Sequence, residues 1–358
     1  MSIKRYIFES FPLWLKVYLY KKTRLNYPCG YGETLSTYIQ QAFNTFLTTE
    51  ELHNASLKNK LTNDIIGCWL KYKALPYEYF LFDFRNTPQK CQRAKFLTDW
   101  DRLPKLSQMP GSKEFVHDIN NKYNFYCKMK SFFKREAMLV DKATSKEEFI
   151  QFALRVKVIF AKLIAGSKGF GAISRNITTT KEAEALYKEL LTKGNSWIVE
   201  ERIQQSAITS QWCTTCVNTI RIPSFLTSKG FFILDPFFRT GHEGSIVDNA
   251  GQGGVFAVID PETGTLITDG VDEAGKYYKQ HPDSNLPFKG WQIPFWKELV
   301  ETAEKAHRML PNQKYIGWDF ALTKENEWVL IEANWGQMVG QYATKKGIKE
   351  EFYHYLEM

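Results

Sequence analysis

Two carboxylates and an amide near the end of the chain could together bind a metal ion. They are Asp319, Glu332 and Asn334, and they lie in two apolar and aromatic runs that are separated by the polar residues 324–327. Two such runs around a short polar stretch predict a β-hairpin. Because side chains alternate along a strand, Glu332 and Asn334 fall on the same face.

The turn sets which residues of this hairpin face each other. If residues 324–327 form the turn, Thr323 faces Trp328 and Asp319 lies opposite Glu332. Facing carboxylates repel each other, so either one of them takes up a proton or a cation lies between them. Oxygen ligands suit Mg²⁺, which binds through few carboxylates and shares its coordination shell with substrate phosphates. The hairpin therefore suggests a nucleotide site; the alternative is an exposed hairpin whose acids face water.

A lysine followed by a glycine-rich loop is the second chemically suggestive feature. The apolar strand expected at 156–164 carries Lys162 on the same face as Val158 and Phe160. A lysine on such a face is costly unless it meets an anion or reaches water. The loop at 166–171 contains three glycines, and bare backbone of this kind can donate to phosphate oxygens. We favour phosphate binding, and a simple turn is the alternative.

Alternating strands and helices would position these groups. A helix is expected at 181–193, followed by a strand at 197–203 that carries two glutamates. Strand, loop, helix and acid-bearing strand in this order are typical of a nucleotide-binding lobe. Further on, we expect strands at 217–223 and 231–238, a long loop at 241–254, a hairpin at 255–267 and a helix at 294–310. The two strands bring Arg221 and Arg239, and His307 on the last helix is expected to be structural.

The first part of the chain, residues 1–115, contains no catalytic grouping and is expected to be a mostly helical accessory domain. A helix start is expected at 48–51, where threonines precede two glutamates. The aromatic stretch 77–85 fits either a strand or a buried helix. The apolar stretch 11–20 is expected to be a buried N-terminal helix, with an interfacial helix on an anionic membrane as the alternative.

Composition narrows the class of protein. The 358 residues are 44% hydrophobic and 24% charged, as in a soluble globular protein. The net charge of +8 is scattered, which disfavours nucleic acid and suits anionic small molecules or an acidic surface. Cys213 and Cys216 form a CxxC without a second pair, so we expect free thiols in a reducing compartment. Neither a signal peptide nor a transmembrane run is recognisable, and we expect a cytoplasmic protein.

Several strings, taken in order, resemble one family. They are FAKLIAGSKGFG, WIVEERIQQ, CVNTIRI, VDNAGQGGVFAVIDPETG, IGWDFALT and VLIEANWG, within about residues 115–345. Together they resemble the ATP-grasp superfamily, and within it the sugar-transfer-associated ATP-grasp family of bacterial capsule and surface-polysaccharide loci. The resemblance implies an α+β fold whose two lobes hold ATP between them, with the helical accessory domain at 1–115. The nucleotide-binding lobe would span 116–204, and the C-terminal lobe with the metal and acceptor site 205–358.

The resemblance also implies roles for individual residues. ATP contacts would fall on Lys122, Lys162, Gly166, Ser167, Lys168, Gly169, Gly171, Glu200, Glu201 and Ile203, acceptor contacts on Asn218, Asp248, Asn249, Gly253 and Gly254, and Mg²⁺ ligands on Asp319, Glu332 and Asn334. Many ATP-grasp ligases carry an arginine where this chain has Gly317, so Arg221 or Arg239 would supply the catalytic charge together with Lys162. Glu200, Glu201 and Ile203 would form the hinge between the lobes that hydrogen-bonds adenine. After this hinge, Gln205-Ser206 replaces the Gln-His that the family often has.

The activity that the resemblance implies is ATP-dependent carboxylate–amine ligation through an acyl phosphate, with ATP and Mg²⁺ as cofactors. The substrates would be a small carboxylate and an amine, and the family context suggests a saccharide-linked sugar acid or amino acid in surface-polysaccharide biosynthesis. One alternative is a phosphotransferase on the same fold, and another is a non-catalytic nucleotide-binding partner of a glycosyltransferase. Peripheral membrane or glycosyltransferase association and the oligomeric state are left open.

Overall fold

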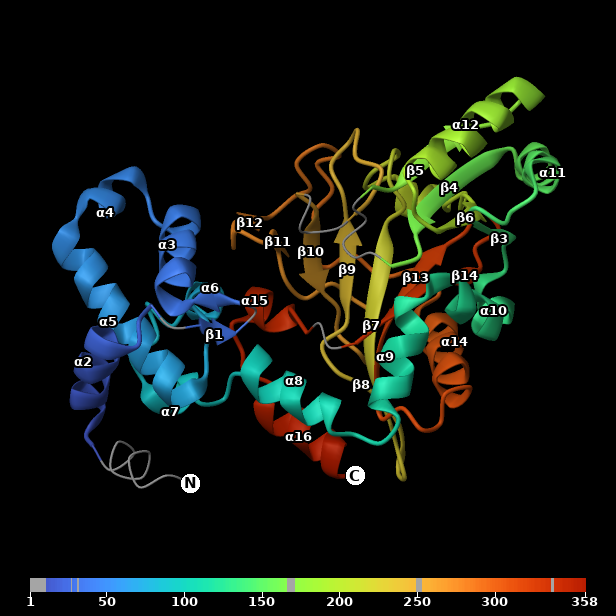
Figure 1. Ribbon diagram of the computed structural model, residues 1–358. Coiled ribbons are helices and arrows are strands. Elements are labelled where there is room, and N and C mark those ends of the chain that lie inside the picture. Colours follow the sequence, from blue (N-terminus) through green and yellow to red (C-terminus); the bar gives the residue numbers. More distant parts are fainter. Residues whose placement is uncertain (1–10, 27, 31, 166–170, 249–252, 336–337) are drawn as a thin grey trace. The chain divides into compact units, whose positions relative to one another are not determined.

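The computed structural model describes residues 11–26, 28–30, 32–165, 171–248, 253–335 and 338–358 (Figure 1). The chain forms two compact units, Met1–Leu106 with Thr344–His354 and Ser107–Ala343 with Tyr355–Met358. The expected accessory domain ends nine residues later, at 115. The difference arises because helix α9 (Ser112–Asn120) packs against α10 (Lys122–Phe133) and strand β14 (Trp328–Asn334), which belong to the second unit.

The first unit is mostly helical, as expected. Its elements are α2 (Leu13–Thr23), β1 (Pro28–Gly30), β2 (Glu33–Thr34), α3 (Leu35–Phe46), α4 (Thr49–His53), α5 (Ala55–Tyr72), α6 (Pro76–Leu81) and α7 (Lys90–Arg93), and α8 (Asp99–Ser107), α15 (Gly340–Thr344) and α16 (Lys349–Glu357) cross its boundaries. The helix start predicted at 48–51 is confirmed, because Thr48 and Glu51 form a reciprocal capping box. The aromatic stretch at 77–85 begins as helix α6 rather than as a strand.

Helix α2 corrects one expectation. The apolar stretch 11–20 does form a helix, but none of the described residues of α2 is buried. Trp14 keeps 71% and Tyr18 57% of its surface exposed. Apolar composition predicted burial, but α2 packs against α5 on one side and leaves its other side open. No helix in the described part of the chain combines the length and the apolar character that a membrane span requires.

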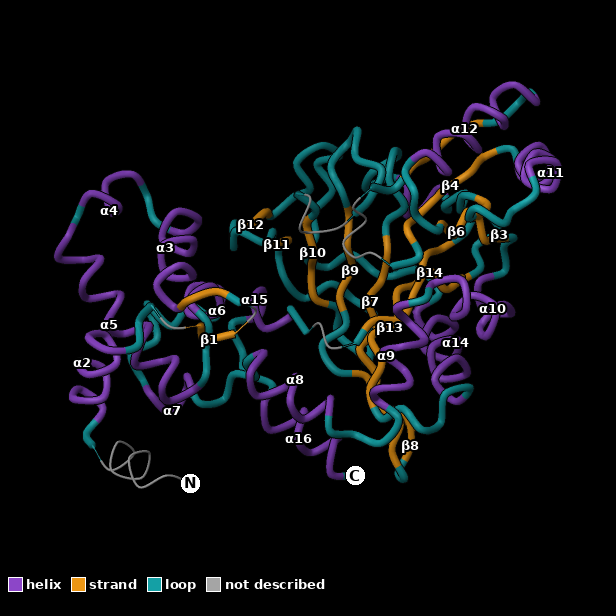
Figure 2. Tube along the Cα trace, in the orientation of Figure 1, coloured by secondary structure: helices purple, strands orange, loops and turns teal. Residues whose placement is uncertain are grey.

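A small antiparallel sheet forms one part of the second unit. Its strands run in the order β3 (Ala137–Val140), β6 (Trp197–Glu201), β4 (Val158–Leu163) and β5 (Ile173–Asn176). Helices α11 (Lys146–Val156) and α12 (Thr180–Thr192) pack together beside it (Figure 2). Ile159 and Ala161 point into this core, so Phe160 and Lys162 point the other way, as the sequence predicted.

A larger antiparallel sheet forms the rest of the unit. Its order is β12 (Tyr277–Tyr278), β11 (Gly270–Val271), β10 (Val255–Val258), β9 (Phe237–Thr240), β7 (Thr219–Thr227), β13 (Tyr315–Leu322) and β14 (Trp328–Asn334), with β8 (Gly230–Ile233) also paired to β7. Helix α14 (Trp296–Arg308) and α10 contribute to its core. The single strand expected at 231–238 is instead β8 and β9, because Asp235 has a φ of 60° and Pro236 follows it.

The β13–β14 hairpin pairs Asp319 with Glu332, as predicted. The expected turn is wrong by one residue, however, because Trp328 faces Leu322 and not Thr323. A β-bulge between the pairs Asp319–Glu332 and Phe320–Leu330 adds one residue to β14 and so restores the register. The two deviations cancel, and both carboxylates lie on the same face of the sheet.

Candidate functional site

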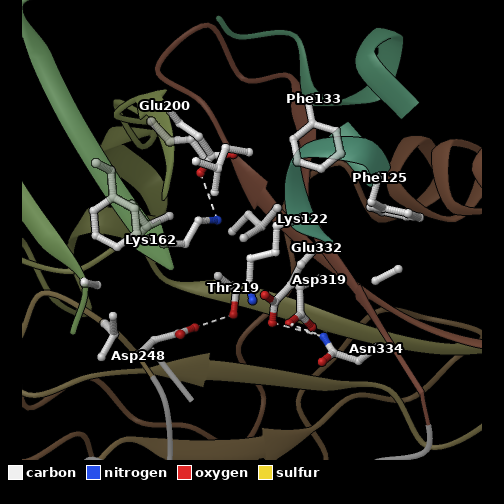
Figure 3. A pocket seen from close by; sticks show the side chains of 18 of the residues that line it. Lys122, Phe125, Phe133, Lys162, Glu200, Thr219, Asp248, Asp319, Glu332 and Asn334 are labelled. Atoms are coloured by element: carbon white, nitrogen blue, oxygen red, sulfur yellow. Dashed lines mark hydrogen bonds and ion pairs between the residues drawn. The ribbon is translucent and has the colours of Figure 1, made fainter. Parts of the chain in front are cut away.

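A cavity of about 360 Å³ lies between the two sheets of the second unit (Figure 3). Its volume is in the range of small-molecule sites. Eleven of the residues predicted from the sequence line it: Lys122, Lys162, Glu200, Glu201, Ile203, Arg221, Arg239, Asp248, Asp319, Glu332 and Asn334. The lining contains six cationic side chains and five carboxylates, so its charge is close to balanced before any anionic ligand enters.

Asp319 is the centre of a buried arginine cluster. The side chain of Asp319 is fully buried, and Arg221, directly opposite it on β7, donates to both of its oxygens, with Nη2 lying 2.8 Å from Oδ2. Arg239 on β9 adds a second ion pair, with Nη2 lying 2.9 Å from Oδ2. Burial alone would raise the pKa of Asp319, but the two arginines hold it below the ordinary value. Uptake of a proton, one of the two expected ways to relieve the facing carboxylates, is therefore not needed at Asp319, whose charge the two arginines neutralise.

Gly317 explains how these arginines fit. A Cβ atom at Gly317 would lie 3.5 Å from Cδ of Arg221, so the side chain of Arg221 passes beside the bare backbone of β13. An arginine at position 317 would compete with Arg221 for the same space. The space beside Gly317 is thus occupied by a cationic side chain from the neighbouring strand.

The residues predicted to bind Mg²⁺ carry suitable oxygen donors. The amide nitrogen of Asn334 lies 3.1 Å from Oδ2 of Asp319 and 3.1 Å from Oε1 of Glu332. Asp319 already accepts four hydrogen bonds, whereas Glu332 takes a single one from the described residues. Within the described chain, no three His, Cys, Asp or Glu side chains are grouped as a complete metal site. The donors therefore fit a Mg²⁺ ion that is bound by Glu332 and Asn334 and whose coordination shell is completed by substrate phosphate. Asp319 would have to release an arginine to bind the ion as well.

Glu200 is the centre of a second buried cluster. Its carboxylate is 2.8 Å from Nζ of Lys162 and 2.9 Å from Nη2 of Arg135. Burial alone would raise the pKa of Glu200, but Arg135 and Lys162 lower it. The anion that Lys162 meets in this structure is thus a carboxylate, on the face where a phosphate ligand was expected. The Glu200 side chain is thus committed to these two cations.

Lys122 extends the cationic wall of the cavity. Its Nζ lies 3.3 Å from the carbonyl oxygen of Ile164. Burial lowers the pKa of Lys122, the carboxylate of Glu332 raises it, and the nearby Lys162 lowers it further. Lys162 is thus a close neighbour of Lys122. A phosphate group bound beside them would offset the repulsion between the two positive charges.

Asp248, predicted to contact the acceptor, lines the cavity beside the arginine cluster. The Thr219 hydroxyl donates to Asp248, and Nε of Arg239 lies 2.9 Å from Thr219 Oγ1 and 3.5 Å from Asp248 Oδ2. Burial raises the pKa of Asp248, and Arg239 opposes that shift.

Asn218, predicted to contact substrate, is not part of the described lining of the cavity. Its amide nitrogen donates to Gln205 and to the carbonyl oxygens of Thr209 and Cys213, and its side chain is buried away from the cavity lining. Two other predicted acceptor residues, Gly253 and Gly254, are likewise not part of the described lining. Gly166, Ser167, Lys168, Gly169 and Asn249 lie outside the described residues, while Gly171 is exposed at the start of β5 with a φ of 75°.

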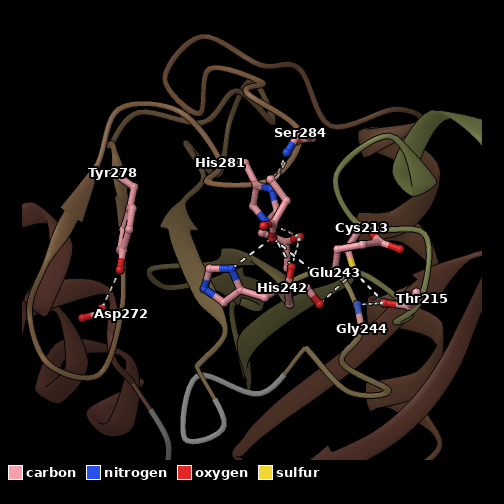
Figure 4. Close-up of polar contacts among 12 residues, drawn as sticks. Cys213, Thr215, His242, Glu243, Gly244, Asp272, Tyr278, His281 and Ser284 are labelled. Carbon is pink, nitrogen blue, oxygen red and sulfur yellow. Dashed lines mark hydrogen bonds and ion pairs between the residues drawn. The ribbon is translucent and has the colours of Figure 1, made fainter.

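Both cysteines of the CxxC motif are buried, whereas Thr214 between them is exposed. Figure 4 shows Cys213 and Thr215 of this segment. Both thiols are free, as expected. A hydrogen bond from Cys216 lowers the pKa of Cys213 to about 6. The threonines between the cysteines hold the loop after β9, since Thr214 donates to the Glu243 carboxylate and Thr215 accepts from the Gly244 amide.

Two functional candidates were missed in the sequence. Thr219 lies inside the strand expected at 217–223, and Arg135 belongs to none of the motifs described in the sequence analysis. Arg135 is 6% exposed and donates both to Glu200 of the small sheet and to the carbonyl oxygen of Leu330 in the large sheet, 2.6 Å away. Its partners lie 65 and 195 residues further along the chain, so no local pattern could have identified it. His307 is structural as predicted, being buried between Ser224 and the Gln313 carbonyl.

A family model described as sugar-transfer associated ATP-grasp matches residues 172–355, just over half of the chain. Among solved structures, D-alanyl-alanine synthetase A from Vibrio cholerae is 13% identical over 67% of this chain and 63% of that chain, with a TM-score of 0.41. N5-carboxyaminoimidazole ribonucleotide synthetase from Thermotoga maritima is 12% identical over 70% of this chain and 52% of that chain, with a TM-score of 0.42. The chain thus spans about half to three fifths of the length of these two proteins. No curated protein sequence matches it.

Proposed function

The chain belongs to the sugar-transfer associated ATP-grasp family, and we propose that it is an ATP-dependent carboxylate–amine ligase that works through an acyl phosphate. One observation carries this proposal. Two arginines that pair with Asp319, an oxygen-donor group formed by Glu332 and Asn334, and the cations Lys122 and Lys162 all line one cavity. Such a cavity can hold a polyphosphate at one side and a second anion beside the transferred phosphoryl group.

In the first proposed step, an oxygen of the substrate carboxylate attacks the γ-phosphorus of ATP. A new P–O bond forms, the bond to the β-phosphate oxygen breaks, and ADP leaves with that electron pair. Lys122 and Lys162 hold the nucleotide phosphates, and Arg239 and Arg221 stabilise the charge on the transferring group. Mg²⁺, held by Glu332 and Asn334, supplies further neutralisation of phosphate charge when it is bound.

In the second proposed step, the amine nitrogen attacks the acyl carbon, and phosphate leaves as the amide bond forms. The nitrogen must lose a proton for the amide to become neutral. Asp248 lines the cavity with a pKa raised by burial, and a carboxylate with a raised pKa is a better proton acceptor than an ordinary one. Its place beside Arg239 puts it next to the group that would hold the leaving phosphate.

The proposed substrates are a sugar acid or amino acid and an amine of surface-polysaccharide biosynthesis. This part of the proposal is supported by the family description, and the cavity supports only an anionic substrate beside ATP. The polysaccharide role and the cytoplasmic location are both parts of the proposal. Identification of the acceptor tests the polysaccharide role.

Product mass tests the proposal directly. The protein is incubated with ATP, Mg²⁺ and pooled sugar acids and amines, and the products are separated and weighed by mass spectrometry. ADP together with a new amide supports the ligase. ADP together with a phosphorylated product would make the protein a phosphotransferase, and the absence of ADP release with every pool would make it a non-catalytic nucleotide-binding protein.

A further inference from the structure

Helix α2 of the first unit exposes an aromatic stripe that ends in a positive charge. Trp14, Tyr18 and Lys22 follow one another at i, i+4 and i+8, so they share one face of the helix. All three are exposed, and Trp14 at 71% is the most exposed large apolar side chain of the described chain. A contiguous exposed apolar patch on a soluble protein often marks an interaction surface.

The opposite face of α2 is already occupied. Leu13 and Val17 lie over the bare backbone of Gly67 in α5, where an added Cβ would meet both at under 4 Å. Trp69 of α5 donates its indole N–H to the Tyr20 hydroxyl at 3.1 Å. The helix is therefore apolar on two sides, and contacts among the described residues of the unit account for only one of them.

The charged residues of the segment that contains the exposed stripe are all positive. Residues 11–26 contain Lys16, Lys21, Lys22 and Arg24 and no aspartate or glutamate. Exposed aromatic rings next to lysine and arginine are the composition of helices that lie in the interface of a bilayer, where the rings enter the headgroup layer and the cations meet anionic lipids.

We propose that α2 is a membrane-docking helix that binds anionic phospholipid surfaces through Trp14, Tyr18 and Lys22. The single sign of charge favours this occupant over a second copy of the chain. A symmetric dimer through α2 would bring the basic residues of both copies together and repel. The proposal goes beyond the ligase activity, since α2 belongs to the first unit and the cavity to the second.

Co-sedimentation of the full-length protein with lipid vesicles tests the proposal. Wild type is expected to sediment with vesicles of phosphatidylglycerol and phosphatidylcholine in equal parts, less so as salt is added, and to stay in solution with phosphatidylcholine alone. The double variant Trp14→Ala, Tyr18→Ala keeps every charge and is expected to bind at least about tenfold more weakly. Lys22→Glu is expected to weaken binding to the anionic vesicles only.

Matched controls separate the helix from general effects. Lys60→Glu makes the same charge change at an exposed position of α5 and is expected to weaken binding less than Lys22→Glu. Because both aromatic rings are exposed, the double variant should keep the thermal unfolding midpoint of wild type. Failure of wild type to bind anionic vesicles, or equal binding by the double variant, would overturn the proposal. So would a wild-type dimer in analytical ultracentrifugation that the double variant abolishes, because α2 would then be a protein interface.

Discussion

Two buried carboxylates of the cavity, Asp319 and Glu200, are each held by two cations, but in different ways. The partners of Asp319, Arg221 and Arg239, come from β7 and β9, which are the next two strands of the same sheet. Glu200 takes Lys162 from a neighbouring strand of the small sheet, but its other partner, Arg135, also donates to β14 of the large sheet.

The two clusters are suited to different roles. A cluster built within one sheet keeps its geometry whatever the other sheet does, which suits groups that must stabilise a transferring phosphoryl group. In a cluster that spans both sheets, one guanidinium group holds the two sheets together. Such a cluster is suited to control how far the cavity opens. The first cluster is then expected to carry charge stabilisation, and the second to carry coupling between the sheets.

Removal of the Asp319 carboxylate should have the largest effect. Asp319→Ala leaves Arg221 and Arg239 buried without their common partner, and breaking a buried ion pair in this way costs about 3–5 kcal/mol. The free energy of unfolding, measured by urea titration, should fall by this amount. Glu325→Ala, an exposed acid at the tip of the same hairpin, should change it by less than about 0.5 kcal/mol. A loss below 1 kcal/mol for Asp319→Ala would show that the arginines do not depend on this carboxylate.

Glu332→Gln should separate chemistry from stability. The side chain is half-buried and has one described hydrogen bond, so the change should alter the free energy of unfolding by less than about 1 kcal/mol. It removes the carboxylate proposed to hold Mg²⁺ and should lower ATP turnover by about 10²–10³-fold. ADP release with the pooled acceptors measures turnover, and Glu325→Gln is the matched control. Unchanged turnover would remove Glu332 from the proposed metal site.

Arg135→Lys tests the cluster that joins the two sheets. Lysine keeps the positive charge near Glu200 but lacks the fork that reaches Leu330, and a lost hydrogen bond to a charged group costs about 1.5–3 kcal/mol. Urea titration measures that loss, and calorimetry should show weaker ATP binding as well. Arg155→Lys, in an exposed pair with Glu136, should stay within about 1 kcal/mol of wild type. If ATP binding is unchanged in Arg135→Lys, the residue is only structural.

The sequence was informative where alternation along a strand decides the outcome. It placed Asp319 opposite Glu332, although the predicted turn was off by one residue and a bulge restored the register. It also oriented Lys162 correctly, because Ile159 and Ala161 on the other face are buried. The same local rules cannot foresee a bulge, since its position depends on packing across the sheet.

The sequence was uninformative where contacts are made across long separations. Arg135 bonds to residues far along the chain, and the burial of α2 depends on how many neighbours cover it, which its own composition does not reveal. Asn218 was assigned to substrate from its position in a family motif, but its amide is used to hold the turn before β7.

The smallest expected effect is on the stability at acid pH, where the pKa shifts of Asp248 and Glu200 have opposite signs. The pKa of Glu200 is lowered in the folded protein, so below the ordinary carboxyl range near pH 4 the unfolded chain binds a proton that the folded protein refuses. Stability is then lost as pH falls, with a slope of up to about 1.4 kcal/mol per pH unit for this group. The pKa of Asp248 is raised, so its contribution runs the other way and is lost as pH rises. Urea titrations across pH 3 to 6 should therefore show a shallower acid loss for Glu200→Gln and a steeper one for Asp248→Asn. The same change of slope in both variants would contradict the assignment of opposite shifts, and with it the distinction between a carboxylate held ionised by two cations and one that burial prepares to accept a proton.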